Sequence, residues 1–157
     1  MQGEEFDEAE FFRAVAGCGA RALLIGRRAL VALGIPVLTA DYDFWLHIDD
    51  IATFNAAVES QGLLPTRTPE EARGRGRYVL ENDERVDVLV ARSLSTVDGV
   101  RVAFDEVWVR RRPLEIRPGI TVTVPALDDL ILTKRFGGRP KDLEDIRLLE
   151  ALRKEDA

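Results

Sequence analysis

Two aspartates separated by a single residue, Asp41 and Asp43, have the spacing in this chain that best suits chemistry. They lie in an apolar segment, residues 41–48, whose alternation predicts a β-strand, so both side chains share a face, roughly 6.6 Å apart. A third carboxylate, Asp87, lies in a second strand-like segment, residues 85–90. Carboxylates brought together repel one another unless protons or a cation neutralise them. Mg²⁺ suits such a set because it prefers carboxylate oxygens and often joins them to substrate phosphates.

The segment before these aspartates predicts a buried strand, a glycine turn and a short helix. Residues 22–25 form the apolar strand, Gly26 marks the turn, and residues 27–33 form a helix that Gly34 and Pro36 end. Free backbone N–H groups at a helix start attract phosphate, and two metal ions can stabilise an in-line phosphoryl transfer. A D-x-D pair is also common on a solvated strand face, and that interpretation stays open.

Composition predicts one compact domain over residues 1–157. The chain has 157 residues, 46% of them hydrophobic, and no apolar run approaches the roughly 20 residues of a membrane helix. The acidic segment 1–5 lacks the basic region of a signal peptide, so we expect a cytoplasmic protein without membrane contact. The single cysteine, Cys18, excludes an intrachain disulfide and is expected to be a small core residue.

The charge balance argues against a surface that clamps nucleic acid as a whole, because the net charge is −6 and such domains are usually basic. Arginines nevertheless gather at residues 73–77 and 110–112. These clusters could grip phosphates through their forked donors, or they could be ordinary solvated loops.

Apolar periodicity and turn residues predict the remaining elements, and together they indicate an α+β fold with a mixed sheet flanked by helices. The expected helices cover residues 4–16, 51–60, 125–135 and 140–152, with a helical turn near 104–108; the expected strands cover 78–80, 85–90, 114–116 and 121–124. Residues 65–76 are expected to be a mobile loop, and Asp49 and Asp50 are expected to cap the helix that follows. In the last helix, the expected apolar stripe comprises Leu143, Ile146, Leu149 and Leu152.

Four short motifs occur in an order that resembles the DNA polymerase beta-like nucleotidyltransferase superfamily, especially its minimal and AbiEii-toxin-like branches. They are I-G-R-R-A-L-V-A-L-G, T-A-D-Y-D-F, R-V-D-V-L-V and K-R-F-G-G-R-P-K-D-L-E-D-I. The resemblance runs from about Ala22 to Leu152, so it covers most of the chain. It implies a nucleotidyltransferase-like mixed β-sheet flanked by α-helices.

The resemblance also implies roles for individual residues. Asp41 and Asp43 would bind metal, and Asp87 would share a metal and activate the acceptor hydroxyl. The expected contacts to the nucleotide are Gly26, Arg27, Thr39, Lys134, Lys141, Asp142 and Asp145. The structural alternatives are that Lys134 complements the dipole at a helix end, and that Lys141 forms ordinary surface pairs with Glu144 and Asp145.

The function that the resemblance implies is Mg²⁺-dependent transfer of a nucleoside monophosphate from an NTP to a hydroxyl of tRNA, a protein or a small molecule. Its most specific form is an AbiEii-like toxin with a cognate antitoxin protein. Two positions depart from the family pattern: Arg27 follows the first glycine where glycine or serine is usual, and Val37 replaces a frequent arginine. Arg27 could obstruct the triphosphate, or its charge could replace a missing contact. The alternative function is therefore a catalytically degenerate domain that binds nucleotide or protein.

Overall fold

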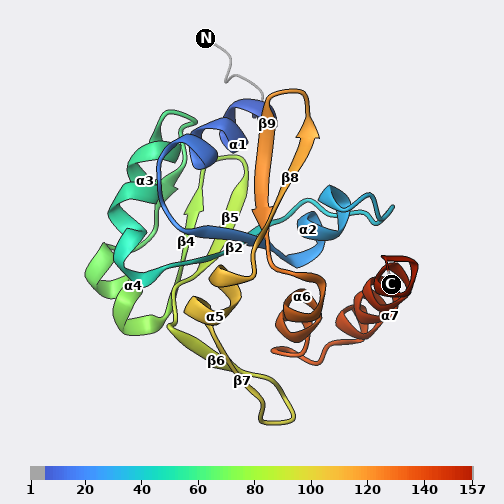
Figure 1. Cartoon of the computed structure of the whole chain (residues 1–157). Coiled ribbons are helices and arrows are strands. Elements are labelled where there is room, and N and C mark those ends of the chain that lie inside the picture. Colours follow the sequence, from blue (N-terminus) through green and yellow to red (C-terminus); the bar gives the residue numbers. More distant parts are fainter. Residues whose placement is uncertain (1–5, 157) are drawn as a thin grey trace.

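A five-stranded mixed sheet forms the centre of the computed structural model, which describes residues 6–156 (Figure 1). In spatial order its strands are β1 (Ala22–Ile25), β2 (Tyr42–Leu46), β5 (Arg85–Leu89), β4 (Arg77–Glu81) and β3 (Leu64–Pro65). Only β2 and β5 pair in parallel, whereas the other neighbours are antiparallel. The expected α+β class with a mixed sheet is confirmed. The acidic segment 1–5 lies outside the described residues.

One face of the sheet is apolar and is covered by α1 (Glu8–Gly17) and α3 (Ile51–Glu59). Phe44 of β2 meets aromatic rings from both helices, Phe11 at 5.9 Å and Phe54 at 5.4 Å between ring centroids. Alternation along β2 and β5 therefore sends the odd-numbered residues to the opposite face. That face carries the candidate site.

The opposite face is covered in part by α5 (Phe104–Val109), α6 (Leu127–Lys134) and α7 (Pro140–Asp156), which lie together on one side of the sheet (Figure 1). Trp45, fully buried in β2, packs edge-on against Phe104 and Phe136 and donates its indole N–H to the Ala91 carbonyl at 2.9 Å. These contacts fix α5 and the α6–α7 connection against β2. The short helix α2 (Gly26–Ala32) follows β1 and contacts both β2 and α7.

Two small hairpins complete the architecture. One consists of β6 (Ser93–Ser95) and β7 (Arg101–Ala103), and the other of β8 (Arg112–Arg117) and β9 (Ile120–Val124). The expected strands at 114–116 and 121–124 and the helical turn near 104–108 are thus confirmed. The β6–β7 hairpin was not expected, because its strands are only three residues long and half of their residues are polar.

The expected mobile loop at 65–76 is wrong, because residues Pro69–Arg75 form a helix, α4. Thr68 and Glu71 make a reciprocal capping box: the Thr68 side chain accepts from the Glu71 N–H, and the Glu71 carboxylate accepts from the Thr68 N–H. Pro69 occupies the first helical position, and Gly76 ends the helix in the left-handed region at φ 76°. Local capping chemistry outweighed the loop-like composition.

Three smaller expectations are also wrong. Cys18 is only partly buried and donates its thiol to the Val15 carbonyl at the end of α1, so it is not a core residue. Asp50 does not cap α3; a 3₁₀ turn, Ile48–Asp50, precedes that helix, and the Asp50 carboxylate instead binds Arg21 at 2.8 Å. Leu143 is 52% exposed, so the apolar stripe of α7 consists of the buried Ile146 and Leu149 and the partly buried Leu152.

Among residues 6–156, no helix combines the length and apolar character that a bilayer crossing requires.

Candidate active site

A cleft of about 440 Å³ opens on the polar face of the sheet, between β2 and β5 on one side and α6 and the start of α7 on the other. Its floor carries Asp43 and Asp87, which are direct register partners on the parallel strands β2 and β5. Asp41 lines the same cleft from the residue before β2, so the expected strand begins one residue later than predicted. The fold therefore gathers at one cleft the three carboxylates that the sequence singled out.

Gly26 holds the turn that places α2 beside Asp43. Its φ of 69° lies in the left-handed region, and a Cβ at this position would lie 2.4 Å from the Oδ2 atom of Asp43. Both the backbone conformation and the close approach therefore require glycine. The expected turn glycine serves to admit the Asp43 carboxylate.

The ionised form of Asp43 is costly in this setting. Burial, together with repulsion from Asp87 and Asp41, raises the pKa of Asp43 to about 6, although the charges of Lys134 and Lys141 act in the opposite direction. A bound cation offsets the repulsion between neighbouring ionised carboxylates. The raised pKa therefore indicates a site at which a bound cation would stabilise the ionised carboxylates.

The wall opposite the carboxylates is basic. Lys134, from the end of α6, is 6% exposed and donates to the Oδ2 atom of Asp145 at 2.8 Å, while Lys141 and Arg139 are exposed at the start of α7. All three basic residues line the cleft. Because Lys134 is buried and anchored at the end of a packed helix, the interpretation of Lys134 as a mere complement to the helix dipole does not account for its placement.

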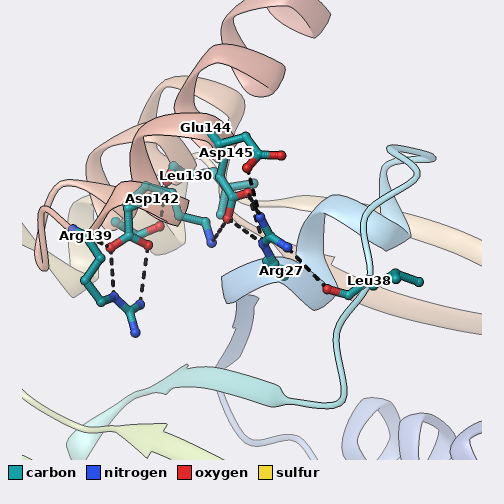
Figure 2. Close-up of polar contacts among 9 residues, drawn as sticks. Arg27, Leu38, Leu130, Arg139, Asp142, Glu144 and Asp145 are labelled. Carbon is teal, nitrogen blue, oxygen red and sulfur yellow. Dashed lines mark hydrogen bonds and ion pairs between the residues drawn. The ribbon is translucent and has the colours of Figure 1, made fainter.

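Asp145 is fully buried and joins α7 to two other elements (Figure 2). Besides Lys134, it accepts from Arg27 of α2, at 3.1 Å from both the Nε and Nη2 atoms. Arg27 also donates to the Leu38 carbonyl at 3.4 Å, and Glu144 lies 3.8 Å from its Nη2 atom. Asp145 is therefore not one half of a surface pair; it is the shared anion of a buried cluster that docks α7 on α2.

Arg27 thus has a structural partner, Asp145, that the family resemblance did not predict. Its side chain extends toward Asp145 and does not line the cleft (Figure 2). It therefore neither obstructs the cleft nor adds its charge to the cleft wall. The first of the two departures from the family pattern is explained by the attachment of α7.

Asp142 fixes the start of α7 at the edge of the cleft. It is 2% exposed and accepts from the Arg139 backbone N–H at 3.1 Å and from the Arg139 guanidinium at 3.0 and 3.3 Å (Figure 2). Burial acts against the charge, but the hydrogen bonds from Arg139 hold the pKa of Asp142 below its usual value. Asp142 therefore stays ionised and orients Arg139 rather than presenting a free carboxylate to the cleft.

Seven of the ten site residues expected from the sequence line the cleft: Gly26, Asp41, Asp43, Asp87, Lys134, Lys141 and Asp142. The other three, Arg27, Thr39 and Asp145, lie outside its lining. The hydroxyl of Thr39 accepts from the Asp41 N–H at 3.0 Å, so Thr39 shapes the turn that carries Asp41.

Two basic residues of the cleft were not expected there as site residues, Arg77 and Arg139. Arg139 belongs to a motif that carried the family resemblance, so its basic character was an available signal. Arg77 lies two residues from Val79, the register partner of Asp87, and alternation along β4 places it on the carboxylate face. Correct assignment of β4 from residue 77 would have identified it.

The donor set suits a metal ion that is shared with a ligand. Within residues 6–156, no three His, Cys, Asp or Glu side chains form a cluster that could hold a metal ion by themselves. Asp87 is engaged by Arg85, whose Nη2 atom lies 3.2 Å from Oδ1. Mg²⁺ commonly takes one or two protein carboxylates and completes its shell with water and phosphate oxygens. Asp43, with Asp87 or Asp41, could supply those carboxylates, and the basic wall could bind the phosphates.

No protein-family model matches the chain, and no curated protein matches it in sequence. Solved structures of similar fold include TM1012 of Thermotoga maritima, assigned as a nucleotidyltransferase, with a TM-score of 0.58, 15% identity and coverage of 92% of this chain and 87% of that protein. The antibiotic-resistance factor ANT(2'')-Ia is also similar, with a TM-score of 0.60, 16% identity and coverage of 89% and 78% of the two chains. The chain therefore has a nucleotidyltransferase-like fold, as its four motifs indicated.

Proposed function

We propose that this protein is a Mg²⁺-dependent nucleotidyltransferase that transfers a nucleoside monophosphate from an NTP to an acceptor hydroxyl. The observation that carries the proposal is the register pairing of Asp43 and Asp87 on the floor of a cleft whose facing wall is basic. The nucleotidyltransferase-like fold supports this function over an unrelated use of paired carboxylates.

The reaction is an in-line displacement at the α-phosphorus. A bond forms between the acceptor oxygen and the α-phosphorus, and the bond from that phosphorus to the oxygen bridging to the β-phosphate breaks. Pyrophosphate leaves with the electron pair of the broken bond. The proton of the acceptor hydroxyl passes to a carboxylate at the floor of the cleft, for which Asp87 is our candidate.

Mg²⁺, when bound, would neutralise the charge that develops on the phosphate oxygens. Asp43 and Asp41 would hold it, and relief of the repulsion around Asp43 would contribute to its binding. Lys134, Lys141 and Arg139 would contact the β- and γ-phosphates from the α6–α7 side. Because Lys134 is held by the buried Asp145, its ammonium is already positioned before the nucleotide binds.

Two finer possibilities remain predictions. The AbiEii-like toxin function requires a cognate antitoxin and rests on the resemblance of the four motifs, the last of which carries Lys141, Asp142 and Asp145 of α7 in a K-D-x-x-D pattern. In that pattern, Asp142 holds Arg139 and Asp145 holds Lys134, so both act on the cleft through other side chains. The degenerate, non-catalytic alternative loses one of its two arguments, since Arg27 is accounted for by Asp145.

Turnover tests the proposal. The protein would be incubated with Mg²⁺, each of the four NTPs labelled at the α-phosphate, and separate fractions of RNA, protein and small molecules. Label should reach one fraction with the wild type and fall at least a hundredfold with Asp87→Asn. Asp83→Asn, in the exposed β4–β5 turn, is the matched control and should retain activity. Metal-dependent NTP binding without transfer to any fraction would favour the non-catalytic alternative.

A further inference from the structure

A second groove, lined by arginines, lies beside the cleft on the same face of the sheet. Its lining consists of Arg67, Arg75, Arg77, Val79 and Arg85, and its volume is about 480 Å³. Four of these five residues carry a permanent positive charge, and no acidic residue lines the groove. This concentration contrasts with the net charge of −6 of the whole chain.

Most of these arginines have no direct ion-pair partner, although the Glu71 carboxylate lies near enough to Arg67 and Arg75 to interact with their charges. Among residues 6–156, no carboxylate lies within ion-pair distance of Arg67, Arg75 or Arg77, whereas Arg85 pairs with Asp87 at 3.2 Å. Guanidinium groups that converge without an anion repel one another, and a bound anion removes that cost. Arginine is also the side chain whose forked donors best match phosphate oxygens.

The local structure fixes the backbone positions that carry these arginines. Arg75 occupies the last turn of α4, which the capping box and Gly76 fix at both ends. Arg67 donates to the Arg77 carbonyl at 3.3 Å, and Arg77 and Arg85 lie on the central strands β4 and β5. Three separate elements therefore present charge to one groove, which an exposed flexible loop would not do.

The groove is continuous with the cleft through Arg77, which lines both. Arg85 provides a second link, because it holds Asp87 on the cleft floor. The NTP phosphates have their own basic wall on the α6–α7 side, formed by Lys134, Lys141 and Arg139. The arginine groove extends from the carboxylates in the other direction, over β4 and the end of α4, so it offers a second substrate a surface separate from that of the NTP.

We infer that the acceptor carries phosphate groups, which bind Arg67, Arg75 and Arg77 while its hydroxyl lies at Asp87. This inference rests on the proposed function for calling the bound molecule an acceptor. The phosphates belong either to the backbone of an RNA end or to a phosphorylated small molecule. In the transfer, the acceptor oxygen bonds to the α-phosphorus, pyrophosphate leaves, and the phosphates held in the groove are unchanged.

Binding of a defined anion tests the inference without requiring turnover. The full chain would be titrated into a fluorescein-labelled RNA of about ten nucleotides, with anisotropy recorded at several salt concentrations. The test variant is Arg67→Gln/Arg75→Gln, and the matched control is Arg73→Gln, an exposed arginine of the same helix outside the groove. Loss of two phosphate contacts should lower the slope of log Kd against log salt by about 1.4 and weaken binding roughly tenfold or more at low salt.

Competition identifies the source of the phosphates. Ribose 5-phosphate and an uncharged nucleoside would each compete with the labelled RNA. Displacement by ribose 5-phosphate at concentrations comparable with the RNA would indicate a small phosphorylated acceptor, and displacement only at far higher concentrations would indicate RNA. Equal competition by the uncharged nucleoside would overturn the inference.

The outcomes separate this inference from the proposed function. Equal loss of binding in Arg73→Gln, or no loss in the double variant, overturns the inference. So does a double variant that loses NTP-induced thermal stabilisation but keeps RNA binding, because the groove would then hold the NTP. Transfer to an acceptor without phosphates, with an unchanged KM in the double variant, would overturn the inference and leave the function intact. Groove-dependent RNA binding without any transfer would refute the function alone.

Discussion

Replacing Asp43 with asparagine should make the metal-free protein more stable at neutral pH while abolishing the proposed Mg²⁺-dependent transfer. The asparagine side chain has nearly the same shape as that of aspartate, so the close approach to Gly26 is kept. The ionised carboxylate of the wild type, however, is buried and repelled by Asp87 and Asp41, which raises the pKa of Asp43 to about 6. The substitution removes that repulsion, because the amide carries no charge at any pH.

The magnitude follows from the pKa. The difference between the ordinary value of 3.8 and about 6 corresponds to roughly 3 kcal/mol in the free energy of unfolding. Asp43 is only partly buried, so solvent screening reduces the effect, and we expect about 1–2 kcal/mol. The folded state binds the Asp43 proton more tightly than the unfolded chain does. Wild-type stability is therefore lost as pH rises through about 4 to 6, and the variant escapes this loss.

Urea unfolding of both proteins, with EDTA present and tryptophan fluorescence from the buried Trp45 and the partly buried Trp108 as the probe, measures this difference. The stability advantage of the variant should be small near pH 4 and complete by about pH 7. Saturating Mg²⁺ and NTP should then stabilise only the wild type, by about 2.7 kcal/mol at a hundredfold excess over Kd. A variant that is no more stable than the wild type at neutral pH, or whose advantage does not depend on pH, would refute the electrostatic reasoning.

Three further substitutions test the geometry around the cleft. Gly26→Ala should lower the free energy of unfolding by about 1–2 kcal/mol and displace Asp43, because the new Cβ would lie 2.4 Å from its carboxylate. Urea unfolding would measure the loss of stability, and an at least tenfold loss of transfer would report the displacement of Asp43. Asp145→Ala should lower the free energy of unfolding by about 3–5 kcal/mol in the same assay, because it leaves the buried ammonium of Lys134 without its anion. A loss below about 1 kcal/mol would contradict the proposed contribution of this ion pair to stability. Arg27→Ser, which restores the residue type usual in the family, should give no gain in transfer rate and a lower thermal midpoint, so a large gain would mean that Arg27 does obstruct the cleft.

Local sequence signals predicted the elements that carry the carboxylates. The apolar run of β1 and the alternation of β2 and β5 are signals within one segment, and each was found close to its predicted bounds. The capping box of Thr68 and Glu71 before α4 is also a local signal, and it outweighs the glycine and charge that favoured a loop in the same segment.

Long-range contacts could not be predicted in the same way. Arg27 and Asp145 are 118 residues apart, and nothing in their spacing indicates that one buried carboxylate would bind both Arg27 and Lys134. Charged side chains on a helix are normally solvated, so a surface pair was an open alternative beside the expected nucleotide contact of Asp145, and nothing in the sequence predicted its full burial. Arg77 lies at the cleft because β4 pairs in register with β5, and this pairing is a long-range contact that the sequence of β4 alone does not predict.

The most direct test of the account follows the two ends of the NTP in one reaction. Wild-type protein would be given Mg²⁺, the preferred acceptor fraction and one NTP, labelled in parallel samples at the α-phosphate or at the γ-phosphate. Nucleotidyl transfer at Asp43 and Asp87 predicts that the α-label becomes attached to the acceptor and that the γ-label appears as pyrophosphate, both lost together in Asp87→Asn. Transfer of the γ-label to the acceptor, or equal release in wild type and variant, would contradict the central claim.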